Sequence, residues 1–329
     1  MRALKYLFLA ALLAVAAAAG WLWWFATHPL DLPRTPFDFT VHSGSGIKTL
    51  SRQLSREGLF REGESFWIVA RLLGRVPTIQ AGTYRLEQPV TPLELLEKLR
   101  RGDVQLIEIL FVEGTTLRQW LAALAGEPQV RRTLEGGDAQ LRAALGIAEP
   151  SAEGWFFPDT YRFAPGVADL EILKRAHAAM TKKLAEAWAA RDPALPLTTP
   201  YEALTLASIV EKETAVAAER PLVASVFVNR LRRGMRLQTD PTVIYGLGEA
   251  YDGNIHKKDL LTDTPWNTYT RDGLPPTPIS MPGLGALQAA VQPAHSDWLY
   301  FVARGDGTHQ FSRTLEEHNR AVAKYQLHR

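Results

Sequence analysis

The chain of 329 residues contains no cysteine, which excludes disulfides, thiolate metal ligands, a thiol nucleophile and a lipid anchor on cysteine. It has 37 basic and 35 acidic side chains and no long block of one charge sign. Nucleic-acid binders usually carry a concentrated basic face, so we expect no nucleic-acid partner. No internal repeat is evident. No group of histidines and carboxylates has convincing metal-ligand spacing, so we expect neither a metal nor another cofactor.

A run of 20 uncharged residues, Tyr6 to Phe25, is the most prominent feature present. A helix of this length matches the ~30 Å hydrocarbon core of a bilayer, so the run predicts a transmembrane anchor over residues 1–26. Arg2 and Lys5 precede the run, which favours a cytoplasmic N-terminus and an exported body. The alternative is a cleaved signal peptide with a small-residue cleavage site at Ala16–Ala19.

The remainder is too long for one average domain, so we expect two, after a proline-rich spacer at residues 27–36. The first is a compact α+β module over residues 37–103. Its expected elements are a strand at 37–41, a helix from Ile47 ending near Gly58, a helix at 65–73 closed by Gly74, a strand at 81–86 and a helix from Thr91 to Leu99.

The second domain, residues 104–329, is predicted to be mainly helical, which makes the fold class α+β. Expected elements are a strand at 106–112, helices at 117–125, 141–145 and 169–190, a helix beginning after Thr199, a strand at 299–302 and a helix at 315–325. From Met235 onward the chain is rich in Gly, Pro, Asn and Thr, which predicts loops and short strands that carry the site.

The helix after Thr199 carries the most interpretable carboxylate. Thr199 and Glu202 form a capping-box pattern, with proline at the first helical position. At about 100° per residue, Glu213 falls in the middle of the apolar stripe of this helix, and Glu211 falls about 160° away. Apolar surroundings and the negative end of the helix dipole both raise a carboxyl pKa, which suits a general acid. The alternative is a buried structural pair with Arg220, Arg230 or Arg236.

Several separate segments then resemble one known family. They are the runs 207–215 (ASIVEKETA), 225–231 (SVFVNRL), 236–246 (RLQTDPTVIYG), 267–269 (NTY) and 273–276 (GLPP), together with 153–155 (EGW) and 158–160 (PDT). In this order they resemble the membrane-anchored endolytic lytic transglycosylases, the MltG or YceG-like family. The resemblance covers nearly the whole chain, including the anchor.

The resemblance implies a LysM-like module followed by a lysozyme-like catalytic domain with loop and strand additions. It implies cleavage of the MurNAc–GlcNAc bond within peptidoglycan glycan strands, without water, leaving 1,6-anhydro-MurNAc ends and terminating strand growth. The second glutamate of the Glu-Lys-Glu motif, Glu213, matches the family's catalytic residue. The chain is thus expected to be a single-pass inner-membrane protein with a periplasmic body, and peptidoglycan synthases are candidate partners.

Other residues of the matching motifs are candidate substrate contacts. Gln238, Asn267 and Tyr269 could donate hydrogen bonds to sugar groups or could equally stabilise turns. Asp240 precedes Pro241, which favours extended backbone, and is a candidate second carboxylate or a turn former. Tyr245 is expected in the cleft, and the motif at 153–155 adds Glu153 to the substrate-binding candidates.

Three other functions compete with this interpretation. A non-catalytic peptidoglycan-binding scaffold would have no need for a carboxylate on an apolar stripe. A hydrolysing muramidase would produce reducing ends and would need a second carboxylate. A pyridoxal-phosphate lyase of the aminodeoxychorismate type would need a buried lysine, whereas Lys212 is predicted to point off the stripe.

Overall fold

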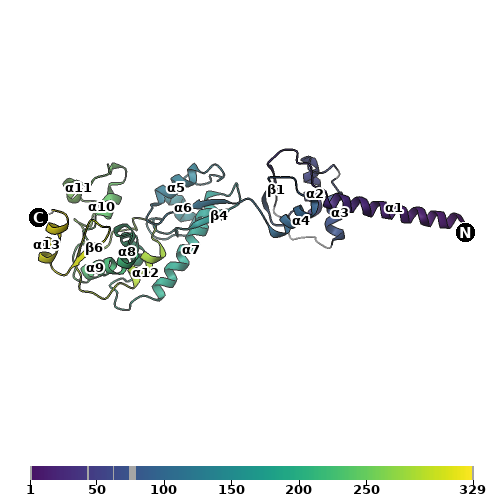
Figure 1. Ribbon diagram of the computed structural model, residues 1–329. Helices are drawn as coiled ribbons and strands as arrows, with labels where there is room; N and C mark the ends of the chain where they lie inside the picture. Colours follow the sequence, from purple (N-terminus) through teal and green to yellow (C-terminus); the bar gives the residue numbers. More distant parts are fainter. Residues whose placement is uncertain (1, 43, 62, 74–78, 328–329) are drawn as a thin grey trace. The chain divides into compact units, whose positions relative to one another are not determined.

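The computed structural model describes residues 2–42, 44–61, 63–73 and 79–327, so the predicted helix end Gly74 lies outside it (Figure 1). The chain divides into two compact units. One is Met1–Ile107 with Arg162–Pro165, and the other is Glu108–Tyr161 with Gly166–Arg329.

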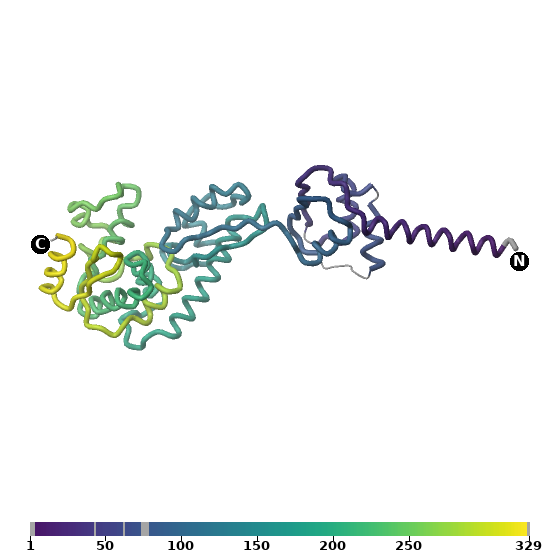
Figure 2. Tube along the Cα trace, viewed as in Figure 1, coloured from purple at the N-terminus to yellow at the C-terminus, as the bar shows by residue number. Residues whose placement is uncertain are grey.

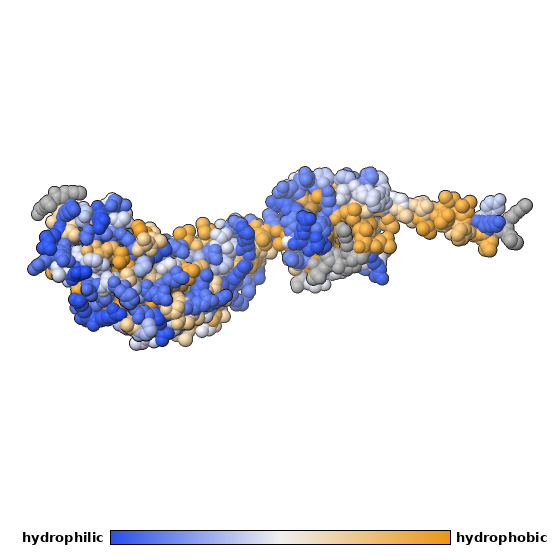
Figure 3. Space-filling model, turned by 60° about the horizontal axis from the view of Figure 1, so that its bottom comes forward, coloured by the Kyte–Doolittle hydropathy of each residue, from blue (hydrophilic) through white to orange (hydrophobic). Residues whose placement is uncertain are grey.

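The first unit begins with helix α1 (Arg2–Thr27). Its segment Leu4–Thr27 has a mean hydropathy of 2.0 and is the one helix in the described residues that is long and apolar enough to cross a membrane. Figure 3 shows apolar side chains along most of this helix. Its last turn joins the core of the first unit, where Ala26 is buried and the rings of Phe25 and Phe60 lie 6.0 Å apart.

The rest of the first unit is a two-stranded antiparallel sheet covered by helices. Its elements are β1 (Phe37–Val41), α2 (Ile47–Arg56), α3 (Ser65–Leu72), β2 (Gly82–Leu86) and α4 (Pro92–Arg101). Residues 37, 39 and 41 of β1 are buried, as expected when alternate side chains of a strand face one core. The Thr91 hydroxyl accepts from the Glu94 N–H, and the Glu94 carboxylate accepts from the Thr91 N–H, which confirms the start of α4.

The chain from residue 107 onward is mainly helical and carries two small sheets. Its elements are β3 (Ile107–Leu110), α5 (Leu117–Gly126), α6 (Gly137–Leu145), β4 (Thr160–Phe163), α7 (Asp169–Ala189), α8 (Pro200–Glu213), η1 (Ala217–Glu219), α9 (Arg220–Arg232), α10 (Asp240–Leu247), η2 (Gly248–Ala250), α11 (Lys257–Leu261), α12 (Leu284–Val291), β5 (Tyr300–Ala303), β6 (His309–Ser312) and α13 (Leu315–Tyr325). Strand β3 pairs with β4, and β5 pairs antiparallel with β6.

Helix α8 lies at the centre of this unit. Every residue from Ala203 to Val210 is buried, and the helix contacts α7, α9, α10 and α12. Figure 2 shows the teal α7 and the yellow-green α12 segments beside the green segment of α8. A helix buried on all sides is held rigidly, so the position of its last residue, Glu213, is set by the whole unit.

The region after Met235 differs from its predicted composition of loops and short strands, because it also contains α10, α11 and α12. Helix α10 begins at Asp240 with Pro241 in its first turn, where extended backbone was predicted. Proline lacks an N–H that the first turn of a helix does not use, so here it starts a helix. The three helices have only 8, 5 and 8 residues, too short for a clear periodic pattern.

The capping box of α8 provides a test of this packing. The Thr199 hydroxyl accepts from the Glu202 N–H at 3.2 Å. Replacing it by Thr199→Ala should lower the free energy of unfolding by about 1 kcal/mol, because the N–H loses its partner. Chemical denaturation of the full chain in detergent measures the loss. Thr199→Ser keeps the hydroxyl and should restore most of it, and equal losses in both variants would contradict the prediction.

Candidate active site

Glu213 lies at the wall of a cavity of about 440 Å³ in the second unit. It is the last residue of α8, so the carboxyl stands at the negative end of that helix. The cavity is walled by residues of α8, α9, α10, β5, β6 and α13 and of two connecting segments. Its polar lining consists of Glu213, Arg230, Gln238, Thr239, Asp240, Tyr269, Tyr300, His309, His318 and Gln326.

The surroundings of Glu213 raise the pKa of its carboxyl toward neutral pH. Burial raises the pKa of Glu213 from 4.5 to about 7, because the ionised form loses hydration. A hydrogen bond from Thr239 opposes this shift, while the negative charge of Asp240 adds to it. Near pH 7 about half of the molecules therefore carry the proton that a general acid needs.

The Thr239 hydroxyl donates to Glu213 Oε1 and is fixed in place by two further buried threonines. The Thr239 N–H donates to Thr268 Oγ1 at 3.1 Å, and the Thr242 hydroxyl donates to the Thr239 carbonyl at 2.7 Å. The hydroxyls of Thr242 and Thr268 lie 2.9 Å apart. This threonine cluster orients one oxygen of Glu213, which favours a single carboxyl position.

The structural alternative, a buried pair between Glu213 and an arginine, does not occur among the described residues. Arg230 donates to the carbonyls of Leu299 and Leu237, both at 2.7 Å. Arg220 pairs with Glu211 at 3.5 Å, and Arg236 pairs with Asp272 at 3.0 Å. All three guanidinium groups are therefore engaged elsewhere.

Glu211 does not face away from the protein, which corrects the prediction from helical phase. Its side chain is only 7% exposed, pairs with Arg220 and accepts from the Gly283 N–H at 2.9 Å. Residues Ala203 to Val210 of α8 are all buried, so this helix has no single solvent face, and Glu211 packs against neighbours of its own. Lys212 is exposed, as predicted, and its ammonium donates to the Gly114 carbonyl.

Three of the six substrate-binding candidates line the Glu213 cavity: Gln238, Asp240 and Tyr269. The Tyr269 hydroxyl donates to Asp240 Oδ1 at 2.5 Å. Burial raises the pKa of Tyr269, and this hydrogen bond raises it further. Gln238 has φ +47°, which makes it the one non-glycine residue with positive φ in the described chain. Such a conformation costs roughly 1–2 kcal/mol and is typical of functional sites.

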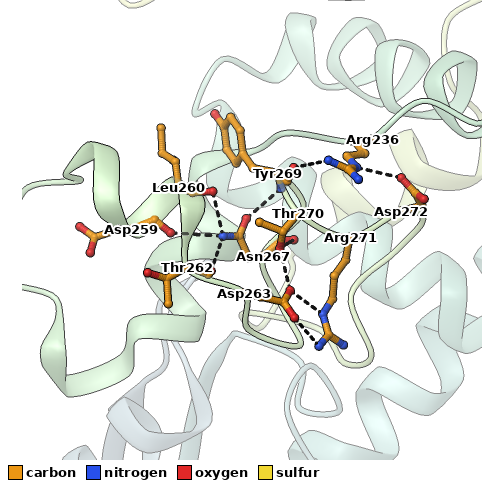
Figure 4. A network of polar contacts seen from close by, with 10 residues as sticks. All are labelled: Arg236, Asp259, Leu260, Thr262, Asp263, Asn267, Tyr269, Thr270, Arg271 and Asp272. Carbon is orange, nitrogen blue, oxygen red and sulfur yellow. Dashed lines mark hydrogen bonds and ion pairs between the residues drawn. The ribbon is translucent and has the colours of Figure 1, made fainter.

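Asn267 is buried, and its contacts are with the backbone of its own loop. Its amide nitrogen donates to the carbonyls of Asp259, Leu260 and Thr262, and its oxygen accepts from the Tyr269 N–H at 2.8 Å (Figure 4). These are the contacts of a turn-stabilising residue, the second of the two roles that the sequence left open. Asn267 thereby positions Tyr269, which does line the cavity.

Glu153 and Tyr245 lie together and do not belong to the residues that line this cavity. The Tyr245 hydroxyl donates to Glu153 Oε2 at 3.2 Å, and both Glu153 oxygens accept from the Leu117 N–H, at 3.0 and 3.2 Å. Burial raises the pKa of Glu153 to about 7. Glu153, which caps the start of α5, and Glu213, at the end of α8, thus both have a pKa raised to about 7.

Motifs and spacing along the chain did not indicate several other polar contacts in and beside the cavity. His309 and Glu219 are 90 positions apart, yet His309 Nδ1 lies 2.7 Å from Glu219 Oε2. Tyr300 and His318 stack with ring centroids 5.2 Å apart. Only the tertiary fold brings these elements together. Within the described ranges, no group of three or more histidines and carboxylates could hold a metal ion.

Known proteins of one family are similar to this chain. A model of the YceG-like family matches residues 39–324. A protein of Bacillus subtilis named endolytic murein transglycosylase is 32% identical, over 89% of this chain and 85% of its own length. A protein of the same name from Streptococcus pneumoniae is 29% identical, over 87% of this chain and 57% of its own length. A crystal structure of a yceG-like protein from Listeria monocytogenes superposes with a TM-score of 0.55 at 29% identity, covering 87% of this chain and 98% of that one.

The raised pKa of Glu213 predicts a pH-dependent cost to stability. In the unfolded chain the carboxyl ionises near 4.5, and in the folded state only near 7, so the cost grows as pH rises between these values. Glu213→Gln removes the charge and should stabilise the protein by about 3 kcal/mol at about pH 8, with little gain at about pH 4.5. Denaturation of the full chain in detergent at both pH values measures this. A gain independent of pH would contradict the assigned burial.

Proposed function

This chain belongs to the YceG-like family, and from that premise we infer that it is a peptidoglycan-cleaving lytic transglycosylase that cuts within glycan strands. We further propose that Glu213 is its general acid. One observation supports this role above all: a carboxyl with a pKa of about 7 in a cavity lined with hydrogen-bonding side chains. Such a group is protonated often enough at neutral pH to give its proton to a leaving sugar oxygen.

The proposed reaction breaks the bond between C1 of MurNAc and O4 of GlcNAc. Glu213 protonates O4 as the bond breaks. The C6 hydroxyl of the same MurNAc attacks C1 and closes a 1,6-anhydro ring, while the carboxylate of Glu213 can take the hydroxyl proton. The nucleophile belongs to the substrate, so much of its orientation entropy is already lost before reaction. Water must be excluded from C1 for the ring to form.

Gln238, Asp240 and Tyr269 are the proposed substrate contacts in the Glu213 cavity. Gln238 is exposed, and its amide can both donate to and accept from sugar groups. Asn267 supports them indirectly, by holding the loop that carries Tyr269. For Glu153 and Tyr245 the observed contacts are within the protein, and we propose a supporting role in which they join α10 to the start of α5.

A hydrolysing muramidase is the second candidate, because Asp240 places another carboxyl in the same cavity. Glycoside hydrolysis needs an acid and a second carboxylate that acts as base or nucleophile. The negative charge of Asp240 raises the pKa of Glu213, which is the coupling expected of such a pair. Against this role, Asp240 Oδ1 already accepts a hydrogen bond from the Tyr269 hydroxyl.

We propose that the first unit contains a LysM-like module at residues 37–103, followed by a lysozyme-like domain at residues 104–329. The order strand, helix, helix, strand over β1, α2, α3 and β2, with the strands antiparallel, supports the first assignment. Helix α8, which is buried in a mainly helical unit and ends at the acid, supports the second.

We also propose that α1 anchors the protein in the inner membrane with a cytoplasmic N-terminus and a periplasmic body. The segment Leu4–Thr27, with a mean hydropathy of 2.0, is long and apolar enough to cross a membrane, which supports the anchor. An anchored enzyme meets glycan strands close to the bilayer, where new strands emerge, and peptidoglycan synthases are the proposed neighbours there.

Mass spectrometry of purified glycan strands incubated with the full chain in detergent tests the function. The wild type should produce anhydro-muramyl ends, and Glu213→Gln should produce at least 10²-fold fewer, because the amide cannot donate a proton to the leaving oxygen. Glu211→Gln is the matched control. It lies on the same helix and keeps an oxygen for the Gly283 N–H, so it should remain active.

Each other product identifies a different function. Reducing ends from the wild type would favour the muramidase and would direct attention to Asp240. Binding without cleavage by the wild type would favour a scaffold. Undiminished cleavage by Glu213→Gln would contradict the assignment of the acid.

A further inference from the structure

His309 lines the Glu213 cavity, is paired with a carboxylate, Glu219, and has no part in the reaction as described so far. Glu219 Oε2 lies 2.7 Å from His309 Nδ1, and Glu219 Oε1 accepts from the His309 N–H at 2.9 Å. The side chains are 13% and 11% exposed. The Phe301 ring meets the imidazole edge-on, with centroids 5.4 Å apart. The imidazole is therefore held in one orientation by a carboxylate and an aromatic ring.

The hydrogen bond to Glu219 assigns the proton on this imidazole. Burial alone would raise the pKa of Glu219, but the hydrogen bonds from His309 outweigh it, and its pKa is lowered. An ionised carboxylate only accepts, so Nδ1 carries the hydrogen. In the neutral imidazole the lone pair is then on Nε2. Nε2 has no hydrogen-bond partner among the described residues, and it is not among their buried unpartnered atoms.

The lone pair of His309 and the proton of Glu213 belong to the same cavity. The two groups are also connected through the chain, because Thr214 follows Glu213 and its hydroxyl donates to Glu219 Oε2 at 3.4 Å. The positive charge of His309 lowers the pKa of Glu213, which shows that they are electrostatically coupled. Glu219 pairs with His309, and the other charged and titratable groups that line the cavity with it are Glu213, Arg230, Asp240, Tyr269, Tyr300 and His318.

We propose that His309, oriented by Glu219, is a second catalytic residue, the general base that takes the proton of the muramyl C6 hydroxyl. This inference rests on the proposed function. Glu213 donates its proton to O4 as the C1–O4 bond breaks, O6 forms the new bond to C1, and the O6 proton passes to His309 Nε2. The products are an anhydro-muramyl end, a free GlcNAc 4-hydroxyl, a Glu213 carboxylate and an imidazolium. Proton transfer from His309 to Glu213, directly or through water, restores both groups.

A separate base removes a geometric conflict from the reaction. A lone carboxyl must first touch the leaving O4 and then O6, although Thr239 fixes one of its oxygens. With His309 as base, the two proton transfers occur at two fixed groups. A carboxylate that holds Nδ1–H and leaves Nε2 free is the arrangement by which enzymes orient a basic imidazole.

The pH dependence of the rate separates the two mechanisms. A single carboxyl that must start protonated predicts activity that only falls as pH rises through about 7. A neutral His309 is needed in addition under our proposal, so kcat/KM should also fall toward low pH, which makes the wild-type profile bell-shaped. Glycan strands without stem peptides are the substrate to use, because they add few titrating groups of their own.

The decisive variant is His309→Asn, whose amide can still donate to Glu219. We expect kcat to fall by about 10²-fold or more with little change in KM, and the residual activity to lose the limb at low pH. Glu219→Gln should move that limb to lower pH, since the imidazolium loses its anionic partner. The matched control is His256→Asn, another histidine paired with a carboxylate, Asp252 at 3.1 Å, which is exposed and outside the cavity lining.

The full chain in detergent is used throughout, and circular dichroism checks that each variant is folded. Should His309→Asn fail to fold, Glu219→Gln tests the same limb of the profile. A wild-type profile with only the high-pH limb, or a His309→Asn variant that retains the bell shape, would overturn the proposal. Failure of the proposed function is seen separately, in the ends that the wild type produces, since a muramidase or a scaffold would leave no anhydro ends.

Discussion

The site depends on one constraint, the burial of an ionisable carboxyl at the end of a central helix. Glu213 ends α8, which contacts four other helices, so the packing of the whole unit sets the position of the carboxyl in the cavity wall. Burial raises its pKa to about 7, and the helix dipole acts in the same direction. Burial of the carboxyl lowers the stability of the folded protein, and the apolar packing of α8 offsets this loss. The raised pKa leaves a proton available on Glu213 at neutral pH.

Around this rigid helix, loops supply the groups that orient the Glu213 carboxyl and line its cavity. Gln238 adopts positive φ directly before Thr239, and the two buried threonines at 242 and 268 hold the Thr239 hydroxyl against Glu213. Asn267 crosslinks its loop through four hydrogen bonds and so positions Tyr269. Strained or fully satisfied backbone of this kind is typical of loops that must hold a fixed geometry without regular secondary structure.

Local sequence signals predicted the elements that depend on local interactions. Several elements have the expected positions, since alternation and capping boxes act within a few residues of the chain. They are the strand at 37–41 and the helices capped by Thr91, Thr116, Thr199 and Thr314. Prediction failed where such signals conflict or are short. Pro241 was interpreted as favouring extended backbone before it, but it occupies the first turn of α10. Glu211 was assigned to solvent because helical phase distinguishes faces, not whether a second layer covers them.

By itself, the sequence determined the apolar N-terminal helix, the α+β class and the family, and it led to the proposal that Glu213 is the acid. These depend on runs, periodicity and motifs along the chain. The tertiary structure alone decided which groups accompany Glu213. It brought Gln238, Asp240 and Tyr269 into the cavity, placed Glu153 with Tyr245 elsewhere, and joined His309 to Glu219. Hydrogen bonds between residues 90 or more positions apart leave no periodic trace in a sequence, because the packing of helices and hairpins, not chain spacing, sets those distances.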